Sequence, residues 1–101
     1  MDSKTRLLYW LLAATKGGPT RVRILKTLEA RPMNLRQLSI DVKLDYKTVQ
    51  GHIEMLMENG ILYTPKRGYG SVYFISPEWE ESIDEFLKGE YDGEKRKKKR
   101  K

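Results

Sequence analysis

Side chains able to read the edges of nucleic-acid bases follow one another closely in the middle of the chain. Gln50 can pair with adenine, and Lys47 can reach guanine acceptors or a phosphate. Tyr46 and Thr48 carry hydroxyls of the kind that hold phosphates, and Gly51 permits a close approach of the backbone to DNA. We therefore predict a DNA-reading helix face here. The alternatives are an ordinary solvated face and, for the glycine, a helix-weakening residue without a role.

Further cations lie outside this stretch. Lys66 and Arg67 occur with Tyr69 in a glycine-containing segment between two runs rich in β-branched and aromatic residues, the pattern of a hairpin loop. Cations at such a tip contact phosphates or enter the minor groove, which adds affinity more than sequence preference. Arg36 and Lys43 flank a short expected helix and could also hold phosphates. The alternative for the loop is an ordinary polar hairpin tip.

Catalytic and metal chemistry have no visible basis in the sequence. The chain has no cysteine and one histidine, and it shows no nucleophile–base constellation, no glycine-rich phosphate loop and no metal-ligand spacing. We predict that the protein is not an enzyme and that it has no metal site and no cofactor. His52 falls near the edge of the expected buried face of its helix, where a packed, hydrogen-bonded role is favoured over a pH switch.

The distribution of charge matters more than the formal net charge of +6. Residues 95–101 carry +7, so that the rest of the chain has a net charge of −1. Within that rest, residues 16–67 carry +5 and residues 76–94 carry −7. The middle of the chain is therefore the candidate nucleic-acid surface. The basic tail would add affinity that depends steeply on salt and carries no sequence information, or it could fold back onto the acidic segment.

Apolar periodicity and capping signals define the elements that must position these residues. Helices are expected over residues 4–16, 19–30, 35–42 and 46–59, with Thr5 or Ser3, Asn34 and Asp45 as N-caps. Strands are expected over residues 61–64 and 71–75, and a fifth helix runs from Pro77 to about Lys88. The order of four helices, two strands and a helix is mainly α with a small β-hairpin, which is the outline of a winged helix-turn-helix.

One domain accounts for nearly the whole chain. We predict a winged helix-turn-helix DNA-binding domain over residues 1–88 and a disordered, acidic-then-basic tail over residues 89–101. The apolar run at residues 7–14 is far shorter than the roughly 20 residues that a bilayer requires, so we expect a buried helix and no membrane association.

A second subunit is expected because the first helix is apolar on every side. One small core would leave apolar side chains of the first and last helices uncovered, and large apolar patches mark interfaces. The predicted dimer interface consists of Leu8, Tyr9, Leu12, Trp79, Ile83, Phe86 and Leu87.

Two local motifs add a family resemblance. The segment Pro19–Leu25 resembles the opening of the second helix in ArsR-like winged-helix repressors. The segments Leu44–Val49, His52–Ile53 and Glu58–Leu62 resemble the recognition-helix region of archaeal ArsR-like regulators. The resemblance covers about residues 7–88 and implies a DNA-binding dimer whose first and last helices form the subunit interface. Metal sensing does not carry over, because the cysteine and histidine clusters of metal-sensing members are missing.

The function predicted from these observations is transcription regulation by a homodimer bound to double-stranded DNA, in the cytoplasm and associated with the nucleoid. The recognition helix would lie in the major groove, with the wing on the adjacent backbone or minor groove. Two alternatives stay open: a sequence-nonspecific DNA-coating or architectural protein, and a winged-helix protein-interaction module of the transcription machinery. Gly51 makes base reading at that one position of the recognition helix less certain, because a larger residue is usual there.

Overall fold

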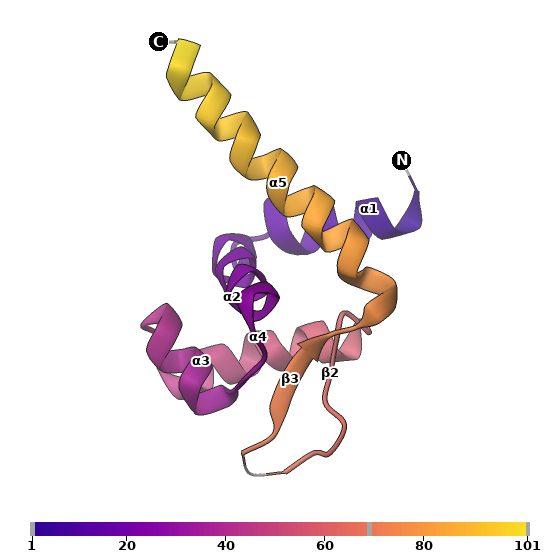
Figure 1. The fold of residues 1–101 in the computed structure, drawn as a ribbon, viewed down its shortest axis with the longest axis vertical. Helices are drawn as coiled ribbons and strands as arrows, with labels where there is room; N and C mark the ends of the chain where they lie inside the picture. Colours follow the sequence, from indigo (N-terminus) through magenta and orange to yellow (C-terminus); the bar gives the residue numbers. More distant parts are fainter. Residues whose placement is uncertain (1, 69, 101) are drawn as a thin grey trace.

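The computed structural model describes residues 2–68 and 70–100, with side chains for residues 2–68 and 70–89. The elements in chain order are α1 (Ser3–Tyr9), the π-helix η1 (Trp10–Ala14), α2 (Gly18–Ala30), β1 (Met33–Asn34), α3 (Leu35–Val42), α4 (Tyr46–Glu58), β2 (Leu62–Tyr63), β3 (Val72–Ile75) and α5 (Pro77–Arg100). Helices dominate, and a small antiparallel sheet lies at one end of the molecule (Figure 1). The expected fold class, a winged helix-turn-helix, is confirmed.

Local capping explains why α3 and α4 begin where they do. The Asn34 side chain accepts from the Gln37 backbone N–H at 2.8 Å, and the Gln37 side chain accepts from the Asn34 N–H at 3.1 Å. Asp45 caps α4 by accepting from the Thr48 N–H at 3.2 Å. Between the two helices Lys43 adopts a left-handed conformation, with φ 61°, which makes the turn tight. The sequence expectation of a short turn between two capped helices is confirmed.

The sheet has the strand order β1-β3-β2, and both pairings are antiparallel. Met33 pairs with Tyr73, while Tyr63 pairs with Phe74, whose ring stacks on it at 5.4 Å between centroids. The sequence analysis did not predict β1, and it made both other strands slightly too long. Because β1 leads directly into α3 and pairs with β3, it fixes the wing relative to the helix-turn-helix.

The first helix differs from the expected continuous helix over residues 4–16. Asp2 caps α1 by accepting from the Thr5 N–H at 2.8 Å, so neither Ser3 nor Thr5 is the cap. After α1 the helix continues as the wider π-helix η1. Gly18 packs so closely against η1 that an added Cβ would lie 2.4 Å from the Leu12 carbonyl oxygen. A tightly packed chain reversal therefore ends the first helical segment before Thr15.

The core is a single cluster in which α1, η1 and α5 lie over α2. Most residues of the predicted dimer interface take part in this packing, because the apolar faces of the first and last helices cover each other within one chain. The residues of that set that are no more than 7% exposed are Leu8, Leu12, Trp79, Ile83 and Leu87. Of the predicted interface, Tyr9 remains 52% exposed and Phe86 partly exposed.

Helix α5 is longer than expected. The sequence analysis ends it at Lys88 and predicts disorder from Gly89, whereas the helical backbone continues to Arg100. Glycines in a helix cost about 1 kcal/mol each, but carboxylates that precede cations along the axis suit the helix dipole. The structure thus has a helical backbone over residues 89–100, where the sequence analysis predicts disorder, and Lys101 lies outside the described residues. Among the helices described, none is both long and apolar enough to cross a membrane.

Candidate nucleic-acid interface

Helix α4 turns one face to the core and the other to solvent. Val49, Ile53 and Leu56 are at most 2% exposed and hold the helix against the domain. On the opposite side, the predicted readers Tyr46, Lys47, Thr48 and Gly51 are exposed, and Gln50 is partly exposed. The N-terminal half of α4 therefore presents polar groups on a rigid, well-anchored helix, as major-groove reading requires.

Thr48 has a structural role that the sequence analysis missed. Its hydroxyl donates to the Asp45 carboxylate at 2.6 Å, in addition to the capping bond from its backbone N–H. The hydroxyl hydrogen bond is the main reason that the pKa of Asp45 lies below its ordinary value. The hydroxyl proton of Thr48 is thus already engaged in the cap, which leaves Tyr46, Lys47 and Gln50 as the freer donors on this face.

Gly51 is open on its outer side. A Cβ built there would meet nothing within 4 Å, so packing inside the chain does not require a glycine. Two roles for Gly51 therefore remain: it allows the helix backbone to approach DNA closely, or it only weakens the helix.

Replacing Gly51 by alanine separates these two roles. We expect Gly51→Ala to raise the free energy of unfolding by about 0.5–1 kcal/mol, because alanine restricts the unfolded chain and favours the helix. Urea unfolding followed by circular dichroism measures this gain, and Gly60→Ala, at φ 74°, is the matched control that should destabilise. A loss of DNA affinity in the more stable Gly51→Ala protein would show that the backbone of α4 approaches the duplex at this point.

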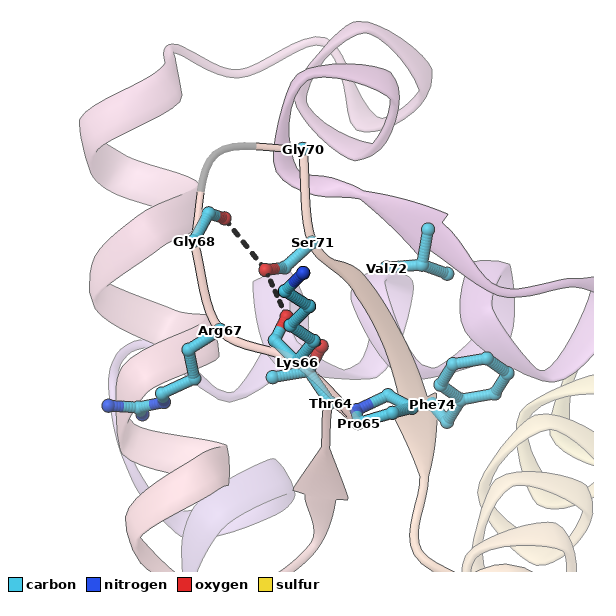
Figure 2. Close-up of a pocket in the computed structure, with 9 residues that line it drawn as sticks. All are labelled: Thr64, Pro65, Lys66, Arg67, Gly68, Gly70, Ser71, Val72 and Phe74. Atoms are coloured by element: carbon cyan, nitrogen blue, oxygen red, sulfur yellow. Dashed lines mark hydrogen bonds between the residues drawn. The ribbon is translucent and has the colours of Figure 1, made fainter.

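The wing loop joins β2 to β3 and is closed on itself. The Ser71 hydroxyl lies 2.6 Å from the Lys66 carbonyl oxygen and 2.7 Å from that of Gly68 (Figure 2). Residues of this loop and of β3 line an open pocket of about 560 Å³. Lys66 and Arg67 are exposed, and Arg67 extends out of the loop on the side away from Val72 and Phe74 (Figure 2). Tyr69, a predicted contact residue, lies outside the described residues.

Arg67 lies next to helix α4, a proximity that the sequence could not reveal. It lines a small pocket of about 200 Å³ together with Gln50, Glu54 and Tyr73. The cation of the wing and the predicted adenine reader of α4 are therefore neighbours. A duplex that enters along α4 would meet both at once.

A larger cleft separates α3 and the start of α4 from the wing. Its volume is about 590 Å³, and its lining includes Arg36, Ile40, Tyr46, Ser71 and Tyr73. The structure thus brings Arg36 and Tyr46 together, whereas Lys43 lies at the turn and does not line the cleft. Ile40 is 67% exposed, an apolar residue on a polar surface that the sequence analysis did not select. The sequence could have indicated this exposure, because Ile40 lies outside the apolar stripe by which α3 packs against the core.

Behind the interface, His52 lies beside the start of α2. A Cβ added to Gly17 would meet the Arg21 guanidinium at 2.8 Å and the His52 ring at 2.9 Å, so that the three residues are close together. Burial, and secondly the charge of Arg21, lowers the pKa of His52 below its ordinary value of 6.5. Within the described residues, no group of three or more His, Asp or Glu side chains is placed to hold a metal ion.

This environment predicts a loss of stability in mild acid. Since the folded pKa of His52 lies below 6.5, the unfolded chain binds the proton more readily. The free energy of unfolding should therefore fall as the pH drops below 6.5 toward the folded pKa, and it should be constant above that range as far as this group is concerned. Urea unfolding at several pH values measures the effect. In His52→Gln this part of the decline should vanish, and an identical pH profile for both proteins would contradict the prediction.

The model of the family described as bacterial regulatory protein, arsR family, matches residues 18–64. The match covers α2, β1, α3, α4 and β2, and it therefore contains the helix-turn-helix and the first strand of the wing. No match to a curated protein reaches significance.

Proposed function

We propose that this ArsR-like helix-turn-helix regulator, a DNA-binding protein of transcription, acts as a homodimer with α4 in the major groove and the wing on the adjacent backbone or minor groove. One observation carries the proposal: the exposed face of α4 and the Arg67 side of the wing lie together, with Gln50 and Arg67 lining one pocket. The proposed role is binding without catalysis, metal or cofactor, in the cytoplasm on the nucleoid. The archaeal type of the resemblance stays a prediction.

The contacts divide by chemistry. Gln50 is proposed to pair with a base, while Lys47 and Arg67 contact a guanine edge or phosphates beside it. Lys66 and Lys43 add phosphate contacts at the wing tip and at the turn. In the cleft between α3 and the wing, Arg36 and Tyr46 are proposed to hold one strand of the backbone, and exposed Ile40 offers an apolar contact for a thymine methyl group.

The homodimer is supported by the aromatic side chains that the core leaves uncovered. Tyr9 and Trp10 follow one another at the junction of α1 and η1, and each is 52% exposed. Large exposed aromatics are enriched at interfaces, where they bury much area at little entropic cost. Phe86 on α5 is partly exposed and could extend the same surface. The proposed interface is thus smaller than the sequence predicts and centred on Tyr9 and Trp10.

Polar substitution of these two aromatics should dissociate the dimer. We expect Tyr9→Ser with Trp10→Ser to weaken self-association by at least about 100-fold, since each buried aromatic anchor contributes roughly 2 kcal/mol or more. Sedimentation equilibrium measures the dissociation constant. Ile40→Ser, which removes an even more exposed apolar side chain elsewhere, is the control and should leave the dimer intact. A wild-type protein that is monomeric at micromolar concentration would refute the homodimer.

Selection of bound sequences from random duplex DNA tests the proposed function directly. A homodimeric regulator should yield two related half-sites about one helical turn apart, roughly 34–36 Å. Footprinting on the selected DNA should then show discrete protection. Uniform coverage without a preferred sequence would favour the DNA-coating alternative, and no binding at all would favour the protein-interaction alternative.

A further inference from the structure

Two basic regions of the protein are separated by an acidic one. The part of the chain that contains the proposed DNA interface, residues 16–67, has a net charge of +5, and residues 95–101 carry +7. Between them, residues 76–94 hold eight acidic groups and Lys88, a net charge of −7. All eight acidic groups and all of the basic end except Lys101 belong to helix α5.

Helix α5 carries its basic end away from the proposed interface. It starts beside β3, packs on α1 and α2, and runs to the end of the molecule opposite the wing loop (Figure 1). At about 1.5 Å per residue, Lys95 lies roughly 27 Å along the helix from Pro77. The longest dimension of the molecule is 46 Å, and the wing loop and the end of α5 lie near its two extremes (Figure 1). A helical end also cannot fold back onto its own acidic segment.

Screening makes the two basic regions independent. The Debye length is about 8 Å at physiological ionic strength, so the basic end of α5 lies several screening lengths from DNA held at α4 and the wing. The carboxylates of α5 lie on the path between the two regions, and Glu78, Glu80, Glu81 and Glu85 are exposed. Because these carboxylates repel phosphates, one duplex is not expected to follow the surface from one basic region to the other.

We infer that the basic end of α5 is a second, sequence-independent DNA-binding site that takes a separate duplex segment, so that the protein bridges two pieces of DNA. Seven consecutive cations match a polyanion, and they suit phosphates better than base edges. DNA is the favoured polyanion because the first site, which rests on the proposed function, holds the protein where DNA is concentrated. An anionic membrane surface is the competing occupant.

A two-duplex capture experiment tests this inference on the full chain. A biotinylated duplex on beads is incubated with protein and with a fluorescent duplex of unrelated sequence, and the fluorescence retained on the beads is measured. The tail variants are a chain that ends at Glu94 and a chain in which every Lys and Arg of residues 95–101 is replaced by Gln. A matched control, R6Q/K16Q/R31Q, removes three exposed cations that belong neither to residues 95–101 nor to the proposed DNA contacts. Light scattering verifies that all variants keep the same oligomeric state.

The expected result is a separation of bridging from single-duplex binding. Both tail variants should retain roughly tenfold less fluorescent duplex, while their affinity for one duplex stays within about threefold of wild type with the same salt dependence. Undiminished bridging by the tail variants would overturn the inference. So would a parallel loss of bridging and single-duplex affinity with a shallower salt dependence, since the tail would then contact the same duplex.

Two further measurements separate the remaining outcomes. If the wild-type protein binds vesicles that contain anionic lipid but retains no second duplex, the basic end is a membrane site and the inference fails. Failure of the proposed function is read independently from the K47A/R67A variant, whose affinity for a single duplex would then equal that of wild type. The two proposals can therefore fail separately.

Discussion

A protein that carries Lys47→Ala together with Arg67→Ala is expected to bind duplex DNA at least about 100-fold more weakly than wild type, since each protomer of the proposed dimer loses both contacts. Each charge-assisted contact contributes roughly 1.5 kcal/mol, which is about tenfold in affinity. Lys47 is exposed on α4, and Arg67 is exposed on the wing loop, which borders α4 at Gln50. The salt dependence should also become shallower. The slope of log affinity against log salt is negative, and its magnitude should become smaller by about 0.9 for each phosphate that the variant no longer neutralises.

Fluorescence anisotropy at several salt concentrations measures both quantities. The fold should be unaffected, because both side chains are exposed. Gln50→Ala is the matched control on α4: it removes a base reader without removing charge, so it should alter the selected sequence and leave the salt slope unchanged. Unchanged affinity and salt slope in K47A/R67A would remove α4 and the wing from the DNA interface, and the protein-interaction alternative would then be favoured.

The helix-turn-helix itself was predictable because its signals are local. Asn34 and Gln37 form their capping box within four residues, and Asp45 caps α4 through Thr48. The outward face of α4 was predicted by placing Val49 at the centre of the inward face. In the structure Val49 is completely buried. These features depend on the helical period and on side chains near the helix ends, both of which are visible in sequence.

Features that depend on distant pairing were not predictable. Strand β1 has two residues, and its pairing partner Tyr73 lies forty positions later in the chain. The same pairing places the wing, and hence Arg67, beside Gln50. Ile40 is exposed because the wing does not cover this part of α3.

Most residues of the predicted dimer interface are buried within one chain, for a related physical reason. Periodicity identifies which face of a helix is apolar, but it does not say what covers that face. Leu8 and Ile83 are apolar residues of the first and last helices, and in the structure these helices pack on each other within one chain. Tyr9 was rightly counted as uncovered, whereas Trp10 was not selected although it is equally exposed.

Replacing Arg21 by alanine is expected to lower the free energy of unfolding by about 3 kcal/mol. Arg21 is 6% exposed, and its Nη1 donates to the Leu11 carbonyl oxygen at 2.6 Å and to the Thr15 hydroxyl at 2.8 Å. These bonds join α2 to the end of η1, where helix carbonyls give a negative potential that favours a cation. Removing the side chain breaks both hydrogen bonds and leaves a cavity.

Burial of the Arg21 guanidinium offsets part of the stability that these two hydrogen bonds provide. Burial lowers the pKa of Arg21, and its Nε is buried without a hydrogen-bond partner. Replacing a buried charged group by an apolar one of similar shape is often nearly neutral, because the desolvation cost disappears together with the bonds. We therefore expect Arg21→Met, which keeps the volume of the stem, to cost less than half as much as Arg21→Ala. Urea unfolding at neutral pH measures both variants, and an unchanged slope with denaturant shows that stability alone has changed.

The pH dependence provides a second, independent reading of the same residue. The charge of Arg21 is one cause of the lowered pKa of His52, although burial is the larger cause. In Arg21→Met the folded pKa of His52 should therefore rise toward 6.5, and the loss of stability below that pH should shrink without disappearing. A profile identical to that of wild type would mean that the two groups do not interact. A profile as flat as that of His52→Gln would mean that charge, and not burial, is the main cause.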